Sequence, residues 1–316
     1  MKIGIGVTNF SWPGPESEIG TRVARIARQA DEAGFDSLWT MDHFFQIRVS
    51  GLPPEAPMLE AYAALAFMAA HTSRIRLGTL VTCVAYRHPG VLIKTVTSLD
   101  VLTGGRMVFG VGAGFAGHPA GTPAPAAAPA NEVDGLGIPF PSLGQRFEQL
   151  EELLQVAHHM WRGDEQPFQG RHYRMDRPIN SPNSLQRPHP PILVAGGGER
   201  KTLRLVAKYA DACNLFDVPG WSEGIPRKLE VLRAHCREVG RDPTEIEKTT
   251  ATQMDLADGP TEAARRLVGR LEELAELGID HAFVVPAPPR PWDEQTLEAV
   301  ASVVPDVHDI STPLVP

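Results

Sequence analysis

A polar pair in the N-terminal third of the sequence has the residue types needed for proton transfer. Asp42 and His43 follow residues 37–41, an apolar run with the pattern of a short strand. An imidazole gains or loses a proton near neutral pH, so His43 at a strand end could act as a general acid or base. Asp42 would then position it. The alternative is a histidine that only makes a structural hydrogen bond to a loop.

Three consecutive glycines at residues 196–198 suggest a site for an anion. They follow the apolar residues 192–195 and precede a predicted helix over residues 199–209. Backbone N–H groups that no side chain shields can approach a phosphate closely at a helix N-terminus. Arg200 and Lys201, expected in the first helical turn, oppose the helix dipole unless an anion is bound there. The alternative is a flexible turn without a ligand.

Alternating glycines at residues 110, 112 and 114 form a second, weaker motif. Their spacing would let a planar ring lie directly against the backbone. Tight packing inside a barrel would require the same residues, so both interpretations stay open. Residues 9–14, the first turn between a strand and a helix, lack the GxGxxG motif of dinucleotide-binding folds.

The motifs above belong to a chain that repeats the order strand, turn and helix. This repeat predicts a parallel sheet covered by helices. Eight such units favour a closed (β/α)8 TIM barrel over an open doubly wound sheet, and place the active site at the C-terminal strand ends. The predicted strands are 3–8, 37–41, 75–81, 107–111, 192–195, 212–216, 248–254 and 282–285, and the predicted helices are 17–33, 59–71, 90–102, 145–161, 199–209, 222–239, 261–277 and 293–303.

Two irregular stretches, about 112–142 and 162–190, account for most of the excess over the roughly 250 residues of an ordinary barrel. We therefore expect residues 1–316 to form one barrel domain with long inserts at its C-terminal face. The first insert shows no helical or strand period. In the second, residues 168–175 could form a short hairpin.

Composition excludes several classes of function. The 30 Lys and Arg against 38 Asp and Glu give a net charge of −8, which disfavours binding to nucleic acid or to an anionic membrane. No signal peptide or membrane-spanning run is expected. Three scattered cysteines without CxxC spacing fit a reducing cytoplasm and argue against a disulfide scaffold or zinc site. His158 and His159 are adjacent on a predicted helix and face different directions, so they form no metal pair. His118 and His172 are expected on surface loops.

Several segments, in this order and spacing, resemble the luciferase-like monooxygenase superfamily, and within it the oxidoreductases that depend on the deazaflavin coenzyme F420. The segments are ADEAGFDSLWTMDH at 30–43, IRLGTLV at 75–81, RHP at 87–89, LDVLTGGR at 99–106, GVGAG at 110–114, GIPFP at 137–141, ILVAGGGER at 192–200 and YADACN at 209–214.

The resemblance implies a TIM barrel that binds a flavin or deazaflavin at its C-terminal face. The ring would rest on a bulge after the third strand, with a non-proline cis peptide at Leu80-Val81. Asp42 and His43 correspond to the pair that contacts ring and substrate. The implied cofactor-binding residues are Thr79, Leu80, Val81, Ala113, Gly114, Ala195, Gly196, Gly197, Gly198 and Arg200.

The chain also departs from similar proteins. Sugar-phosphate dehydrogenases of the family carry an acidic proton donor where this chain has Phe115, which disfavours that substrate class. Residues 116–130, rich in alanine and proline, lengthen the loop before GIPFP. They would form a mobile lid or altered substrate entrance, or else a disordered spacer.

We therefore expect an enzyme that transfers a hydride between F420 and a small organic substrate, with His43 as general acid or base. An FMNH2-dependent monooxygenase on the same barrel is the first alternative. A non-catalytic flavin- or deazaflavin-binding protein is the second. Similar proteins commonly form homodimers. The sequence identifies neither the substrate nor the direction of the reaction.

Overall fold

The computed structural model describes residues 1–47, 50–114 and 132–313, and in this part of the chain a parallel barrel is closed. The strand order is β3-β2-β1-β11-β10-β9-β8-β5-β4, and β3 also pairs with β5, which completes the ring. The strands are β1 (Lys2–Gly6), β2 (Ser37–Thr40), β3 (Arg76–Thr79), β4 (Thr82–Cys83), β5 (Met107–Gly112), β8 (Ile192–Ala195), β9 (Ala212–Asp217), β10 (Glu247–Met254) and β11 (His281–Pro286). The predicted TIM barrel is confirmed.

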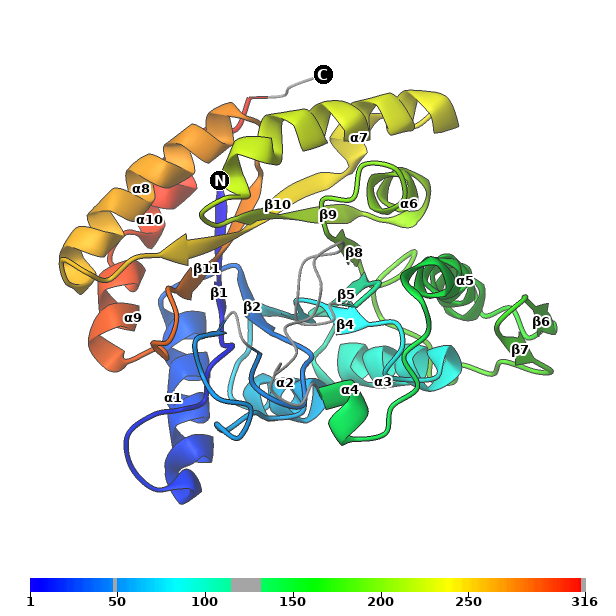
Figure 1. Ribbon diagram of the computed structural model, residues 1–316, viewed down its shortest axis with the longest axis horizontal. Coiled ribbons are helices and arrows are strands. Elements are labelled where there is room, and N and C mark those ends of the chain that lie inside the picture. Colours follow the sequence, from blue (N-terminus) through cyan, green and yellow to red (C-terminus); the bar gives the residue numbers. More distant parts are fainter. Residues whose placement is uncertain (48–49, 115–131, 314–316) are drawn as a thin grey trace.

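Helices surround the strands, as Figure 1 shows, and their buried faces form the main core. In α1, for example, residues at helical spacing (Val23, Ile26, Ala27 and Ala30) are buried. The larger helices are α1 (Ile19–Glu32), α2 (Ala61–Ala69), α3 (Pro89–Leu102), α5 (Leu143–Trp161), α6 (Thr202–Tyr209), α7 (Ile225–Val239), α8 (Pro260–Glu276), α9 (Glu294–Ala301) and α10 (Val304–Asp309). No helix in the described parts of the chain is long and apolar enough to cross a membrane.

Three local expectations are corrected. The stretch 112–142 contains a short helix, α4 (Glu132–Gly135), where no helical period was expected. The predicted strand 75–81 is divided into β3 and the two-residue β4 by the bulge between them. Helix α6 begins at Thr202 and not at residue 199, because residues 199–201 form a turn. Arg200 and Lys201 therefore precede the helix, and the expected conflict with its first turn does not arise.

The predicted hairpin is confirmed as β6 (Phe168–Gln169) paired antiparallel with β7 (Arg174–Met175). Figure 1 shows it projecting away from the barrel, beyond the end of α5. His172 lies in its turn, where Nε2 contacts Oε2 of Glu148 at 2.8 Å. In the same turn, the ring of Tyr173 lies edge-on to that of His88, just before α3, with 5.9 Å between the ring centroids.

Aspartates hold the N-terminal ends of the strands together. Asp36 accepts a hydrogen bond from the backbone N–H of Ile3 at 2.8 Å, and Asp211 accepts one from the N–H of Ile192 at 2.7 Å. In each case an aspartate just before one strand binds the first residues of a neighbouring strand. These bonds satisfy backbone donors that the ladders leave unpaired.

The same mouth encloses a cavity of about 740 Å³, whose lining includes Trp39, Glu247 and His281. Oε1 of Glu247 lies 2.7 Å from Nζ of Lys2 and 3.5 Å from Nδ1 of His281. Burial alone would raise the pKa of Glu247, but the hydrogen bonds and charges of His281 and Lys2 lower it to about 2. This mouth is therefore a stabilising network, as is usual for the N-terminal face of such a barrel.

We expect Glu247→Gln to lower the free energy of unfolding at pH 7 by about 1–3 kcal/mol, because it removes the anion between Lys2 and His281. The folded-state pKa lies below the unfolded value, so this contribution is complete above about pH 4.5 and is lost as the pH falls toward 2. Urea unfolding at pH 7 and at pH 3.5 measures the difference. Glu245→Gln, at the same mouth but with a side chain 61% exposed, should change little. A loss independent of pH would contradict the assignment.

Candidate active site

The C-terminal ends of β2, β3 and β5 meet around the bulge after β3. The predicted non-proline cis peptide at Leu80-Val81 is present. The backbone N–H of Leu80 donates to the carbonyl oxygen of Thr40 at 2.8 Å, which holds the bulge beside the end of β2. Leu80 and Val81 are half-buried, whereas Thr79 is 1% exposed. The two bulge residues are thus the part that can face a ligand.

Glycines of β5 make room for this bulge. A Cβ on Gly110 would lie 1.9 Å from the carbonyl oxygen of Thr79, and one on Gly112 would lie 3.0 Å from Cγ2 of Val81. Thr79 Oγ1 also donates to the carbonyl oxygen of Gly110 at 2.9 Å. Close strand packing therefore accounts for Gly110 and Gly112, and they need not contact a ring themselves.

Asp42, directly after β2, is buried and paired with Arg87. Its two carboxylate oxygens accept from Nη1 and Nη2 of Arg87 at 2.6 and 2.9 Å, and Arg87 also pairs with Glu60. The guanidinium lies over the rings of Tyr62 and Phe44. Burial raises the pKa of Asp42, while the hydrogen bonds and charge of Arg87 oppose that rise. The ion pair with Arg87 therefore holds Asp42 in place, and with it the backbone that leads into His43.

His43 is held by Glu132 of α4, a residue that the sequence analysis missed. Nδ1 of His43 lies 2.6 Å from Oε1 of Glu132, and the hydroxyl of Tyr86 donates to the same oxygen. The other oxygen accepts from the backbone N–H groups of Phe44 and Phe45. Burial would raise the pKa of Glu132, but these donors lower it, so the group stays a carboxylate.

Glu132 did have a signal in the sequence. It is the first carboxylate after Arg106, and with Asp134 it is one of two in the irregular stretch 112–142. A carboxylate in a stretch so poor in charged residues is a candidate for a specific partner, but the partner's identity does not follow from spacing. His43 lies 89 positions earlier in the chain.

The end of β5 is fixed by Arg146 of α5. Its Nη1 donates to the carbonyl oxygens of Ala113 and Gly114 at 2.9 and 3.1 Å, and its guanidinium stacks on Phe140 at 3.8 Å. Ala113 and Gly114 are half-buried, so their backbone is available at the barrel mouth. Phe115 and residues 116–130 lie outside the described residues, and so does His118.

The glycine loop after β8 is built as an open backbone segment. Gly196 has φ +114°, which a residue with a side chain rarely adopts, and its N–H donates to the carbonyl oxygen of Asn214 at 3.1 Å. A Cβ on Gly198 would lie 2.7 Å from Oγ1 of Thr202, and one on Gly197 would lie 3.2 Å from Cε of Lys228. Ala195 is half-buried and Arg200 is exposed.

Lys228 of α7 is the second residue that the sequence analysis missed. Its side chain passes over Gly197, and its Nζ pairs with Oε1 of Glu199 at 2.9 Å. Among the described residues, no hydrogen bond uses the N–H of Gly197 or Gly198. A loop with free N–H groups and a nearby ammonium is suited to hold a phosphate.

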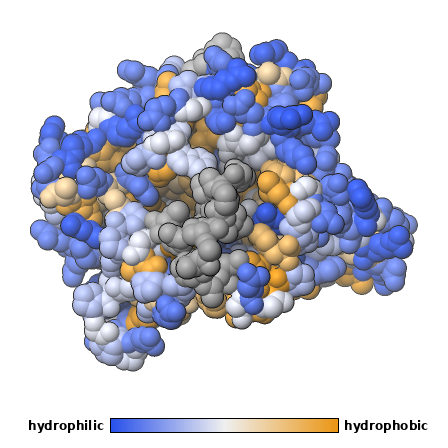
Figure 2. Space-filling view, in the orientation of Figure 1, coloured by the Kyte–Doolittle hydropathy of each residue, from blue (hydrophilic) through white to orange (hydrophobic). Residues whose placement is uncertain are grey.

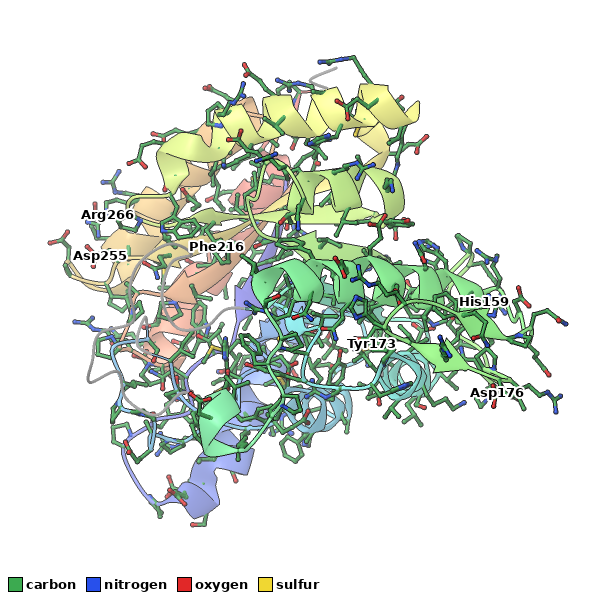
Figure 3. All side chains as sticks on the ribbon, turned by 45° about the vertical axis from the view of Figure 1, so that its right-hand side comes forward. His159, Tyr173, Asp176, Phe216, Asp255 and Arg266 are labelled. Carbon is green, nitrogen blue, oxygen red and sulfur yellow. The ribbon has the colours of Figure 1, made fainter. Side chains whose placement is uncertain are left out.

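The two histidines of α5 bond to groups outside this site. His158 Nε2 contacts the carbonyl oxygen of Tyr209 at 3.1 Å, and His159 Nε2 contacts that of Gln166 at 2.9 Å. Figure 3 shows His159 on the hairpin side of the molecule, opposite Asp255 and Arg266. Among residues 1–47, 50–114 and 132–313, no three His, Cys, Asp or Glu side chains form a metal site.

Together the fold and the site define a class: a (β/α)8 barrel with an open glycine loop after β8 and a carboxylate-held imidazole at the C-terminal mouth. The chain belongs to the luciferase-like monooxygenase family, whose sequence profile matches residues 1–307.

Among curated proteins, the chain is 30% identical over 250 residues to an F420-dependent glucose-6-phosphate dehydrogenase of Kineococcus radiotolerans, covering 77% of this chain and 66% of that one. An F420-dependent hydroxymycolic acid dehydrogenase of Mycobacterium tuberculosis is 28% identical over 233 residues, covering 72% and 57%. The chain thus matches less than two thirds of the length of each of these relatives, 66% and 57%.

Solved structures confirm the fold. An F420-dependent secondary alcohol dehydrogenase bound to an F420–acetone adduct superposes with a TM-score of 0.77 at 20% identity, covering 98% of this chain and 99% of that one. A monooxygenase from Streptomyces bottropensis gives a TM-score of 0.71, also at 20% identity, with 96% and 98% covered.

We expect Arg87→Met to lower the free energy of unfolding by about 3–5 kcal/mol, because it leaves the buried Asp42 carboxylate without its bidentate partner. Adding Asp42→Asn should recover part of this loss by removing the unpaired charge. Urea unfolding at pH 7 provides the measurement. Arg22→Met breaks the more exposed pair with Glu18 and should cost less than about 1 kcal/mol. Equal losses in both arginine variants would refute a buried pair at Asp42.

Proposed function

We propose that this protein is an F420-dependent oxidoreductase that transfers a hydride between F420 and a small organic substrate. One observation carries the proposal. A carboxylate-held imidazole lies at the same barrel mouth as the 80–81 bulge and the glycine loop, in a chain 30% identical to an F420-dependent dehydrogenase. When bound, the deazaflavin would give or accept the hydride. His43 would supply or remove the accompanying proton.

The residues at the mouth fit such a cofactor. We propose that its ring lies against Leu80, Val81, Ala113 and Gly114, whose backbone is accessible there. Thr79 would support the bulge through its hydrogen bond to Gly110. Its phosphate would bind at residues 195–198, with Arg200 and Lys228 as nearby cations. A side chain on Gly197 would crowd Lys228, and one on Gly198 would collide with Thr202, so the loop is built for bare backbone. Asp42 would act through Arg87 and the backbone beside His43.

We further propose that the substrate is uncharged. Arg87 is neutralised by Asp42 and Glu60, and Arg146 is occupied by carbonyl oxygens and a phenyl ring. Residues 115–131 contain no Lys, Arg, Asp or Glu, and Phe115 stands at the family's acidic proton-donor position. In Figure 2 several hydrophobic residues border the centre of the face shown, and hydrophilic residues predominate at its rim. These features favour an alcohol or carbonyl compound over a sugar phosphate.

An FMNH2-dependent monooxygenase is the second candidate, because a monooxygenase shares this fold and the same loop would accept an FMN phosphate. A protein that binds F420 or FMN without turnover is a third. The proton-transfer group at the mouth favours an enzyme over this last possibility.

Fluorescence titration of the purified protein with F420 and with FMN tests the proposal. We expect F420 to bind at micromolar concentration or below and FMN to bind more weakly. His43→Ala should lower turnover by about 100-fold, the scale of a lost general acid or base, with nearly unchanged F420 affinity. His159→Ala, which changes a histidine of α5 with a similarly buried side chain, 13% against 15% exposed, is the matched control. Tighter FMN binding would favour the monooxygenase, and unchanged turnover would remove His43 from the reaction.

We also propose that the protein is a cytoplasmic homodimer and that residues 1–316 form one domain. The buried thiols are free, as expected in a reducing compartment, and the family profile covers nearly the whole chain. The support for a homodimer comes from α2. Its solvent-facing residues Ala63, Ala66 and Phe67 are all apolar and exposed. Such a helix face favours burial against a second copy.

Phe67→Glu should shift a dimer toward monomer by placing a charge on this face. Sedimentation velocity at several concentrations measures the change. Val239→Glu at the end of α7 replaces an apolar residue of similar exposure, 40% against 42%, and should leave the oligomeric state unchanged. A wild-type protein that stays monomeric at all concentrations would refute the homodimer.

A further inference from the structure

One carboxylate at the barrel mouth, that of Glu132, accepts hydrogen bonds from four donors. Oε1 of Glu132 binds Nδ1 of His43 and the hydroxyl of Tyr86, and Oε2 binds the N–H groups of Phe44 and Phe45. The side chain of Glu132 is 6% exposed. Two of these donors are backbone groups that cannot reverse their role, so the orientation of the carboxylate is fixed.

An ionised carboxylate only accepts hydrogen bonds, so the His43 nitrogen that faces it must carry a hydrogen. The neutral ring then has its lone pair on Nε2. In the described part of the chain Nε2 makes no hydrogen bond, and the side chain remains 15% exposed. Nδ1 is committed to the protein, and Nε2 is the nitrogen available to a substrate.

The other ionisable groups around His43 do not compete for this role. Asp42 is occupied by both arms of Arg87, and Glu60 pairs with the same guanidinium. Burial raises the pKa of Cys83 to about 12, which keeps its thiol neutral. Burial and the hydrogen bond to Glu132 raise the pKa of Tyr86, so its phenol stays a donor. Glu132 is therefore the group that selects the tautomer.

We infer that Glu132 is a positioning residue that holds His43 as the Nδ1–H tautomer and makes Nε2 the atom that exchanges a proton with the substrate. Tyr86 helps to orient the same carboxylate. The tautomer follows from the geometry alone, whereas the identity of the proton that is moved rests on the proposed function.

The proposed step balances in both directions. In oxidation of an alcohol, the hydroxyl proton passes to Nε2 of His43, the carbinol carbon loses its hydride to the cofactor, and a carbonyl compound remains. In reduction, a hydride reaches the carbonyl carbon while Nε2–H gives its proton to the oxygen. The imidazolium form keeps its Nδ1–H on the carboxylate of Glu132, which stabilises the charge where it forms.

The substitution Glu132→Gln gives a sharp test, because the two backbone donors dictate how the new amide is oriented. Its oxygen must face the N–H groups of Phe44 and Phe45, so its NH2 group faces His43. Nδ1 must then accept a hydrogen bond, and the neutral ring is driven to the Nε2–H tautomer.

Imidazole ¹⁵N chemical shifts of the full chain without cofactor, recorded above pH 8 and assigned with His43→Asn, report the tautomer directly. We expect Nδ1–H in the wild type, in Tyr86→Phe and in the control Glu55→Gln, which removes an exposed carboxylate from the loop between β2 and α2. We expect Nε2–H in Glu132→Gln. A wild-type Nε2–H form, or an unchanged tautomer in folded Glu132→Gln, would overturn the inference. If Glu132→Gln does not fold, the wild-type spectrum decides.

Turnover with F420 and an uncharged secondary alcohol is the second readout. We expect Glu132→Gln to lower kcat by roughly 100-fold with little change in KM, and Glu55→Gln to match the wild type. A kcat unchanged despite an inverted tautomer would refute the role of Nε2. If the wild type turns over no substrate with F420, the proposed function fails, while the NMR result still decides whether Glu132 sets the tautomer.

Discussion

The approach of β3 to β5 is the contact on which the site depends. It closes the barrel, and it requires Gly110 because the carbonyl oxygen of Thr79 occupies the place of a side chain. Thr79 Oγ1 bonds to the backbone of Gly110 and lies 2.8 Å from Oγ1 of Thr82, so both sides of the bulge are fixed to the same strand pair. The half-buried surface of residues 80–81 is thus a consequence of barrel closure.

Two acidic residues at the mouth have different tasks because their partners differ. Asp42 is bound to a guanidinium that cannot give up its charge, so the pair is a fixed support. Glu132 is bound to an imidazole, a group that can accept or donate a proton, so the pair can take part in acid–base chemistry. The environment, more than the residue type, assigns these roles. The opposite mouth uses its carboxylates to bind strand ends and stabilise the barrel.

Two described residues of the insert 112–142, Gly114 and Glu132, are held at the site. Gly114 is bound by Arg146, and Glu132 is bound by His43, Tyr86 and two backbone N–H groups. The described residues on either side of positions 115–131 therefore both belong to the site. This arrangement tolerates a long insertion, because loop-closure entropy rises only slowly with length when the ends are fixed by other contacts.

The sequence by itself determined the barrel, the face that carries the site, and the local motifs on it. Periodicity located the strands and helices, and the resemblance placed the cis peptide at Leu80-Val81. These features are encoded over a few neighbouring residues. Only the tertiary structure showed that Glu132 holds His43, that Lys228 reaches the glycine loop, and that Gly110 serves strand packing. Each of these contacts joins residues that are far apart in the chain. A helix or strand produces a regular spacing of apolar residues among neighbours in the sequence, whereas a contact between distant residues produces no such spacing.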